Sequence, residues 1–205
     1  IKDKNIEANT DYIYLSNHRS YLDVFIALIS IKRRKKFIGK VEVFKWPIIG
    51  YFAQKFGHIA VKRDSKYSRK RSYQDLLKFA KNGNSIFICP EGAVYMNDKL
   101  INEMRNGAFR IAIESKTPVV AISMINAGEL FPPDKIRIRP GKCINYMSAP
   151  FQTQSLTLDD VNTLRESVKK EILNNLKFHY PSGKYPIEFN PHDYTESVYL
   201  NTHKE

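Results

Sequence analysis

Residues 12–23 decide the fold, and they read Tyr-Ile-Tyr-Leu-Ser-Asn-His-Arg-Ser-Tyr-Leu-Asp. The aromatic and apolar residues Tyr12–Leu15 predict a short strand. The pattern over Ser20–Ile31 predicts that a helix follows almost at once. A strand that runs directly into a helix is typical of an α/β sheet. His18 and Asp23, whose side chains are suited to acid–base chemistry, fall at this junction, where a functional site is expected.

Beyond this junction, short apolar stretches alternate with helical patterns. Further strands are predicted at Phe37–Ile38, His58–Val61, Ser85–Cys89 and Val119–Met124. Further helices are predicted near Pro47–Phe56, at Ser68–Asn82, at Met104–Ser115 and over 161–176. Ile136–Ile138 and Lys142–Tyr146 flank Pro140-Gly141 and predict an antiparallel hairpin. The alternation predicts an α/β fold: a single domain with a mixed, partly parallel sheet covered by helices.

The net charge of +12 is concentrated in the first third of the chain. Residues 1–71 hold 17 Lys and Arg against 6 Asp and Glu, a net charge of +11, whereas residues 72–205 hold 16 against 15, or +1. This asymmetry favours an anionic partner, which is a phospholipid surface, a nucleic acid or a polyphosphorylated substrate. The five consecutive cations at residues 32–36 are equally well explained as a solvated loop.

His18 and Asp23 suit acid–base chemistry if they touch. Positions five apart on a helix point about 140° apart, so contact requires His18 in the turn and Asp23 inside the helix. A carboxylate on one imidazole nitrogen fixes the tautomer while the other nitrogen accepts a hydroxyl proton. The alternative is that Asp23 only serves the first helical turn, as the pattern Ser20-x-x-Asp23 allows.

Three later segments carry polar residues at the ends of predicted strands or the start of a predicted helix. Gly57–Arg63 is a strand that ends in two cations, Lys62 and Arg63. Ile86–Gly92 is a strand that runs into Pro-Glu-Gly, so a carboxylate lies at the strand's carboxyl end, where α/β sheets place their sites. Arg105 opens the next helix.

In order and spacing these segments resemble the conserved blocks of the glycerolipid acyltransferases, which include the lysophosphatidate acyltransferases. His18 and Asp23 match the first block, Gly57 through Arg63 the second, Pro90-Glu91-Gly92 the third, and Pro118-Val119 the fourth. The resemblance covers residues 11–150, and residues 105–109 echo the helix start between the third and fourth blocks.

The resemblance implies a role for each matched residue. His18 is the general base for the acceptor hydroxyl, and Asp23 orients it. Arg63, with Lys62 or Arg105, holds the acceptor phosphate. Glu91 and Gly92 shape the acceptor pocket. Backbone amides near the first block stabilise the oxyanion.

By the same resemblance, the hydroxyl attacks the thioester of acyl-CoA or acyl-carrier protein directly, with no cofactor, metal or covalent acyl-enzyme. Residues 1–180 form the acyltransferase domain, and residues 181–205 are expected to be a C-terminal extension packed on the surface.

The third block departs from the family pattern, because Cys89, Ala93 and Val94 stand where Phe, Thr and Arg are usual. The missing Arg normally helps to hold the acceptor phosphate, so a lysophospholipid with a different headgroup is an alternative acceptor. The sequence is also compatible with a non-catalytic lipid-binding relative and with a basic nucleic-acid-binding module. We expect no nucleic acid, because we find no zinc knuckle or recognisable nucleic-acid motif.

Two cysteines form no disulfide scaffold, which indicates a reducing compartment. No uncharged stretch approaches the roughly 20 apolar residues that cross a bilayer. The longest, Thr117–Gly128, predicts a buried strand. We expect a protein associated with the cytoplasmic face of a membrane, and since the chain begins at Ile1, an upstream anchor in the natural chain stays compatible with the sequence.

Overall fold

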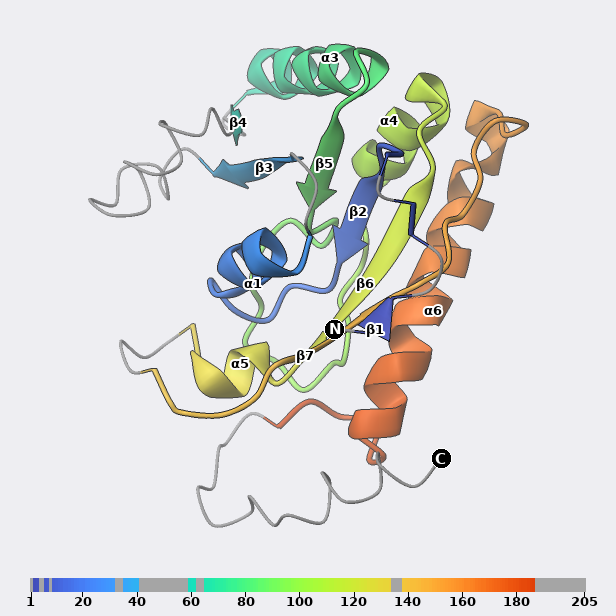
Figure 1. The fold of residues 1–205 in the computed structure, drawn as a ribbon. Helices are drawn as coiled ribbons and strands as arrows, with labels where there is room; N and C mark the ends of the chain where they lie inside the picture. The colour runs from blue at the N-terminus through green and yellow to red at the C-terminus, as the bar shows by residue number, and fades with distance from the viewer. Residues whose placement is uncertain are drawn as a thin grey trace.

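The computed structural model describes residues 2–3, 6–7, 9–31, 35–40, 59–61, 65–133 and 138–186. Its centre is a seven-stranded sheet in the order β1-β7-β6-β2-β5-β3-β4 (Figure 1). Only β6 and β7 pair antiparallel among the described strands, so the sheet is mixed and mainly parallel, as predicted. The strands are β1 (Lys2–Asp3), β2 (Ile13–Ser16), β3 (Lys35–Lys40), β4 (Ile59–Val61), β5 (Ser85–Ile88), β6 (Val119–Ile125) and β7 (Ile144–Met147).

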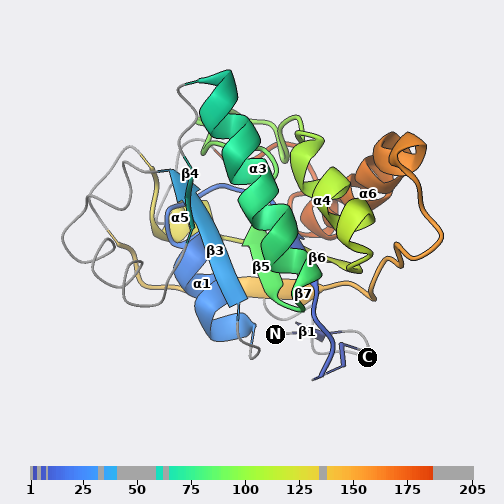
Figure 2. The ribbon, with the colours of Figure 1, turned by 90° about the horizontal axis from the view of Figure 1, so that it is seen from above.

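Helices cover both faces of the sheet (Figures 1 and 2). Alternate residues of a strand point to opposite faces, and here they enter two separate cores. Ile13 and Leu15 pack with α3 (Lys66–Lys81), α4 (Gly107–Ser115) and α6 (Val161–His179). Tyr12 and Tyr14 pack on the other face with α1 (Asp23–Ser30). The central strands are therefore buried on both sides, which explains their nearly continuous apolar sequence.

The element predictions hold for most of the described chain. All of the described strands except β1 were predicted, and α6 has its predicted stripe at Val161, Leu164, Val168, Ile172 and Leu176 buried. The predicted helix near Pro47–Phe56 lies outside the described residues. The short helix α5 (Ala127–Leu130) had no counterpart in the sequence analysis.

The predicted hairpin after Pro132 is wrong in its pairing. Its second strand is present as β7, but β7 pairs antiparallel with β6, with Ile122 opposite Met147. Residues 138–143 are in no strand, and Ile136 lies outside the described residues. All four residues of β7 have a backbone partner in β6.

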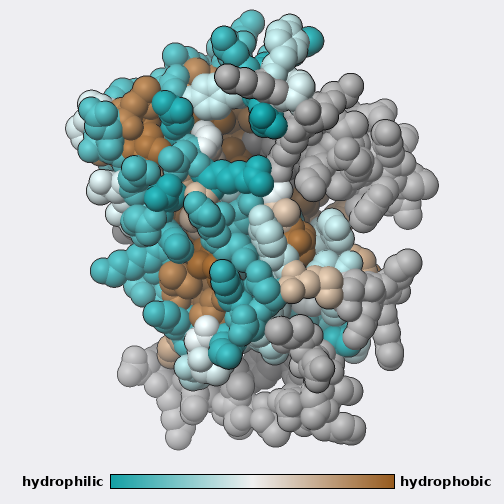
Figure 3. All heavy atoms as spheres, turned by 180° about the vertical axis from the view of Figure 1, so that it is seen from behind, coloured by the Kyte–Doolittle hydropathy of each residue, from teal (hydrophilic) through white to brown (hydrophobic). Residues whose placement is uncertain are grey.

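The surface seen from behind is mainly hydrophilic, and apolar side chains are exposed there in small separate patches (Figure 3). Among the described helices, none combines the length and the apolar character needed to cross a membrane.

A buried polar network joins the C-terminal segment to α5. The Glu129 carboxylate accepts hydrogen bonds from the hydroxyls of Tyr180 (2.7 Å) and Tyr185. All three side chains are buried, and burial raises the pKa of Glu129 despite these two bonds. The backbone N–H of Tyr185 also bonds to the carbonyl of Asp98 at 2.7 Å. The segment around Tyr185 therefore closes over the loop that follows β5.

Gly128 lies where this network leaves no room for a side chain. A Cβ placed there would collide with the Tyr185 hydroxyl and stand 3.0 Å from the Arg19 carbonyl oxygen. At Gly107, by contrast, a Cβ would meet nothing within 4 Å.

We predict that Gly128→Ala lowers the free energy of unfolding by about 1–3 kcal/mol, the usual effect of overpacking a filled interior. Gly107→Ala, the control, should leave stability nearly unchanged. Denaturant unfolding of both variants measures the difference. Equal stability of the two would show that Tyr185 does not close tightly on α5.

Candidate active site

The site lies where three neighbouring parallel strands, β2, β5 and β6, end. β2 pairs with β5 on one side and β6 on the other, so the residues that follow them meet at one edge of the sheet. His18 comes after β2, and Cys89 and Glu91 come after β5. This is the carboxyl edge at which sheets of this class carry their sites.

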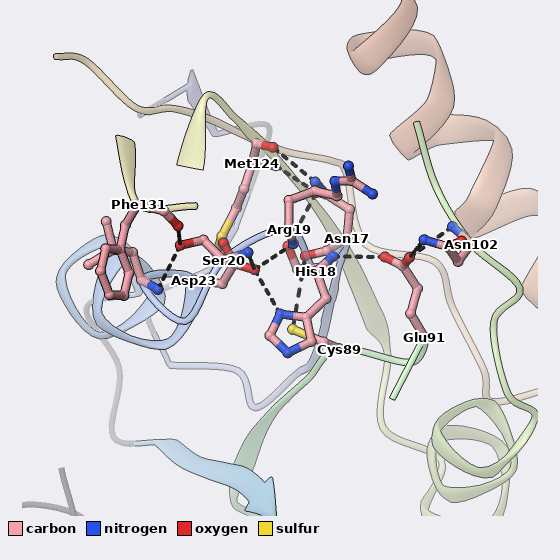
Figure 4. Close-up of polar contacts among 12 residues, drawn as sticks. Asn17, His18, Arg19, Ser20, Asp23, Cys89, Glu91, Asn102, Met124 and Phe131 are labelled. Atoms are coloured by element: carbon pink, nitrogen blue, oxygen red, sulfur yellow. Dashed lines mark hydrogen bonds and ion pairs between the residues drawn. The ribbon is translucent and has the colours of Figure 1, made fainter. Parts of the chain in front are cut away.

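His18 and Asp23 make the predicted contact. His18 lies in the turn between β2 and α1, and Asp23 is the first residue of α1. Nδ1 of His18 is 2.8 Å from Oδ2 of Asp23 (Figure 4). The His18 side chain is 18% exposed and that of Asp23 is fully buried, so one end of the imidazole reaches solvent while the other is held inside.

Asp23 also shapes the turn, so both interpretations of the sequence pattern apply. The same Oδ2 accepts hydrogen bonds from the backbone N–H groups of Arg19 (2.9 Å) and Ser20 (3.0 Å). These bonds hold residues 19–22 outside the helix, which is why α1 begins at Asp23 and not at the predicted Ser20. A single carboxylate oxygen therefore fixes the turn and the imidazole together.

Two further side chains hold the turn from either side. The Asn17 side chain bridges the backbone of Met124 in β6, accepting from its N–H (2.8 Å) and donating to its carbonyl (2.9 Å). Oε1 of Glu91 accepts from the His18 N–H at 2.7 Å. Oε2 of Glu91 accepts from the backbone N–H (2.8 Å) and side chain (2.9 Å) of Asn102. Glu91 is fully buried, so it acts on His18 through the backbone.

These bonds correct one expectation from the family resemblance. The backbone N–H groups of His18, Arg19 and Ser20 are all taken by carboxylates. They are not free to stabilise an oxyanion, and the expectation is wrong for these three amides.

Electrostatics favour a proton on His18. Burial opposes protonation, whereas Cys89 and the Asp23 carboxylate favour it, and the pKa of His18 stands well above its ordinary value of about 6.5. Burial also raises the pKa of Glu91, against the lowering effect of its bonds to Asn102 and to the His18 N–H. Burial likewise raises the pKa of the Cys89 thiol, against the lowering effect of the neighbouring His18.

His18, Asp23 and Cys89 also form a group that could ligate a metal, because one ligand atom from each lies within 4.8 Å of the others. Nδ1 of His18 and Oδ2 of Asp23 are already hydrogen-bonded to each other, however. That contact satisfies both atoms without an ion.

The remaining predicted site residues lie in different settings. Gly92 follows Glu91 with a left-handed φ of 80°, which its lack of a side chain permits. Arg105 has an exposed side chain, and its backbone N–H bonds to the Pro90 carbonyl at 3.0 Å, which ties it to the turn after β5. Lys62 and Arg63 lie outside the described residues. Their phosphate-binding role stays a prediction.

Sequence reasoning missed Arg19, whose side chain is almost fully buried next to the site. Its guanidinium donates to the Asn97 carbonyl at 2.7 Å and lies 3.9 Å from the centre of the Tyr185 ring. Nothing in the local sequence separates this buried Arg from the many exposed cations of the same region. Asn17 and Asn102 were missed as well, because their partners are distant in sequence.

Comparison with known proteins identifies the family. A family model described as acyltransferase matches residues 1–125. A chloroplastic 1-acyl-sn-glycerol-3-phosphate acyltransferase of Brassica napus is 33% identical over 125 residues, which cover 61% of this chain and 36% of that protein. A 1-acyl-sn-glycerol-3-phosphate acyltransferase of Saccharomyces cerevisiae is 24% identical over 180 residues, covering 83% of this chain and 57% of that protein. The chain thus spans between about a third and somewhat more than a half of the length of these curated relatives.

A solved structure has the same fold. The crystal structure of PlsC, the 1-acyl-sn-glycerophosphate acyltransferase of Thermotoga maritima, superposes with a TM-score of 0.73. The match covers 86% of this chain and 70% of that chain at 20% sequence identity. It confirms the predicted fold class.

We predict that Glu91→Gln loosens the His18 turn, because an amide cannot accept on both sides as the carboxylate does. A buried N–H would lose its partner, at a cost of about 1–3 kcal/mol in unfolding free energy. Glu103→Gln, at an exposed position, is the control. Denaturant unfolding should separate the two variants. Equal stabilities would contradict the anchoring role of Glu91.

Proposed function

The chain belongs to the acyltransferase family, and we propose that it is an O-acyltransferase that moves a fatty acyl group onto the free hydroxyl of lysophosphatidate. The names of the relatives support this acceptor, since those quoted above are 1-acyl-sn-glycerol-3-phosphate acyltransferases. The observation that carries the proposal is the 2.8 Å contact between His18 and Asp23 at the carboxyl edge of the sheet.

His18 acts as the general base in this proposal. Since Nδ1 faces Asp23, the proton on that nitrogen is fixed, and Nε2 carries the free lone pair when His18 is neutral. Nε2 takes the proton from the acceptor hydroxyl as its oxygen attacks the acyl carbonyl. The Asp23 carboxylate stabilises the imidazolium that forms. His18 then returns the proton to the leaving thiolate, so the cycle needs no external acid.

The acyl donor is a thioester, either acyl-CoA or acyl-carrier protein. Both present the same carbonyl and the same sulfur leaving group, and the described residues hold no feature that separates them. The imidazole is 18% exposed, so a donor carried by a large partner can reach it at the sheet edge.

The acceptor phosphate is assigned to Arg63, with Lys62 or Arg105 beside it. Val94 stands where the family pattern has an Arg, so this chain lacks one cation after β5. Arg105 is exposed, and its backbone N–H bonds to the Pro90 carbonyl in the same turn, which supports it as a substitute for the missing cation. A guanidinium binds phosphate through paired hydrogen bonds.

The proposed location of the reaction is a membrane surface, on the cytoplasmic face of the membrane. Both the acceptor and the product are lipids, and the net charge of +11 on residues 1–71 suits an anionic surface.

The test is release of free thiol from palmitoyl-CoA and from palmitoyl-acyl-carrier protein, with and without lysophosphatidate. We predict release that depends on the acceptor. His18→Ala should lower kcat by roughly 10²–10⁴-fold, the usual size of general-base catalysis. His179→Ala is the control, because His179 lies on α6 and bonds to Tyr146, away from the site.

Assays with further acceptors separate the candidate functions. Thiol release that is weaker with monoacylglycerol than with lysophosphatidate would support recognition of the acceptor phosphate. Thiol release only with lysophosphatidylcholine or lysophosphatidylethanolamine would support the acyl-transfer reaction and contradict lysophosphatidate as the acceptor. No release with any acceptor and either donor would contradict the proposed function.

A further inference from the structure

Arg19 carries a positive charge into the interior, one position after His18. Its side chain is only 4% exposed. Among the described residues, no carboxylate lies within ion-pair distance of its guanidinium, and its buried Nε has no hydrogen-bond partner there. A buried charge without a direct counter-charge is costly, so its presence at this position calls for an explanation.

The guanidinium of Arg19 holds the loop that follows β5. Nη2 donates to the Asn97 carbonyl at 2.7 Å. Nη1 donates to Oδ1 of Asn97 at 3.3 Å and to the Lys99 carbonyl at 3.4 Å. A planar guanidinium presents several donors in a fixed geometry, so it can bind two points of one loop at the same time.

From this loop the contacts lead back to His18. Nδ2 of Asn97 donates to Oδ1 of Asn102 at 2.8 Å. Asn102 donates to Oε2 of Glu91, whose Oε1 accepts from the His18 N–H (Figure 4). Because Arg19 is the next residue after His18, these contacts form a closed ring. The guanidinium closes it, so the loss of the guanidinium bonds frees one side of the loop that supports His18.

Tyr185, from the C-terminal segment of residues 180–186, holds the guanidinium in place. The centre of its ring lies 3.9 Å from Cζ of Arg19, well inside the range of a cation–π contact. The backbone N–H of Tyr185 bonds to the Asp98 carbonyl at 2.7 Å, and Lys184 pairs with Lys99 in an antiparallel bridge. The segment therefore binds the loop that Arg19 holds.

We propose that Arg19 is a positioning residue for the acyl transfer, and that Tyr185 keeps its guanidinium in the position that the reaction needs. The proposal rests on the proposed function and deepens it. It adds to the active site a segment that lies beyond residues 1–125, which the family model matches. Arg19 acts through the loop and the His18 backbone. A base that is misplaced by about 1 Å can slow a reaction by on the order of 10²-fold.

The ring and the hydroxyl of Tyr185 can be tested separately. Tyr185→Phe keeps the ring over Arg19 and loses the hydrogen bond to Glu129, whereas Tyr185→Leu loses both. Either change leaves the buried Glu129 with one donor fewer, so both should lower the denaturant midpoint. A purely structural role predicts the same kcat for the two folded variants. The positioning role predicts that only Tyr185→Leu is slow.

The experiment measures acceptor-dependent thiol release from palmitoyl-CoA under conditions where denaturant unfolding shows each variant to be folded. We expect kcat to fall roughly 10–100-fold in Tyr185→Leu and in Arg19→Met, with both KM values nearly unchanged, because a misplaced base weakens only the transition state. Tyr185→Phe should keep most of the kcat. The double variant Arg19→Met/Tyr185→Leu should be no slower than Arg19→Met. Val168→Ala, in the buried core of α6, is the control for lost stability alone.

Equal kcat in Tyr185→Phe and Tyr185→Leu, or losses that multiply in the double variant, would overturn the positioning role and leave the proposed function intact. The NMR signals of the His18 imidazole test the same role without turnover. If the natural protein releases no thiol, the proposed function is wrong. Imidazole signals that shift in Tyr185→Leu and Arg19→Met but not in Tyr185→Phe would still support the positioning of His18, and unchanged signals would overturn it.

Discussion

The site depends on one buried carboxylate oxygen, Oδ2 of Asp23. It receives the His18 imidazole at 2.8 Å and the backbone N–H groups of Arg19 and Ser20 at 2.9 and 3.0 Å. Charge-assisted bonds to a carboxylate that is out of water are strong, and leaving such a group without partners is costly. The turn can therefore take only a conformation that delivers all of these donors to one point. The position of His18 is a consequence of this constraint.

The rest of the fold supports that point from neighbouring strands. Asn17 fastens the turn to Met124 in β6, and Glu91 fastens it to the segment after β5. On the outer side, Tyr185 packs over Arg19 and donates to Glu129, so a segment more than 160 residues away in the chain covers the turn. A buried polar group without a hydrogen-bond partner destabilises the fold, and in this network the buried groups serve as partners for one another.

The features that depend on local residue patterns could be predicted from the sequence. The strands at 13–16 and 85–88, the core stripe of α6 and the contact of His18 with Asp23 follow from periodicity and from the chemistry of residues at strand ends. The later start of α1 could not be predicted from helix propensity, because it results from the reach of Asp23 back to Arg19. The pairing of β7 was mispredicted, because β6 competes with the sequence neighbour.

The residues that support the His18 turn could not be predicted, because their partners are distant in sequence. The Asn17 contact with Met124 spans 107 positions, and the Glu129 contacts with Tyr180 and Tyr185 span 51 and 56. A single sequence carries no signal that joins such positions. The same limit applies to Cys89, whose closeness to His18 depends on the parallel pairing of β2 with β5.

The central claim is that Asp23 holds His18 as the base of an acyl-transfer reaction, and the pH dependence of kcat/KM tests it most directly. The base must be neutral to accept a proton, and its pKa is raised, so kcat/KM with lysophosphatidate should rise with pH and level off above the ordinary histidine value of about 6.5. In Asp23→Asn the carboxylate is lost, so the midpoint should fall to lower pH and the plateau should drop. A midpoint that does not move in Asp23→Asn, or a rate without a histidine-dependent rise, would contradict the account.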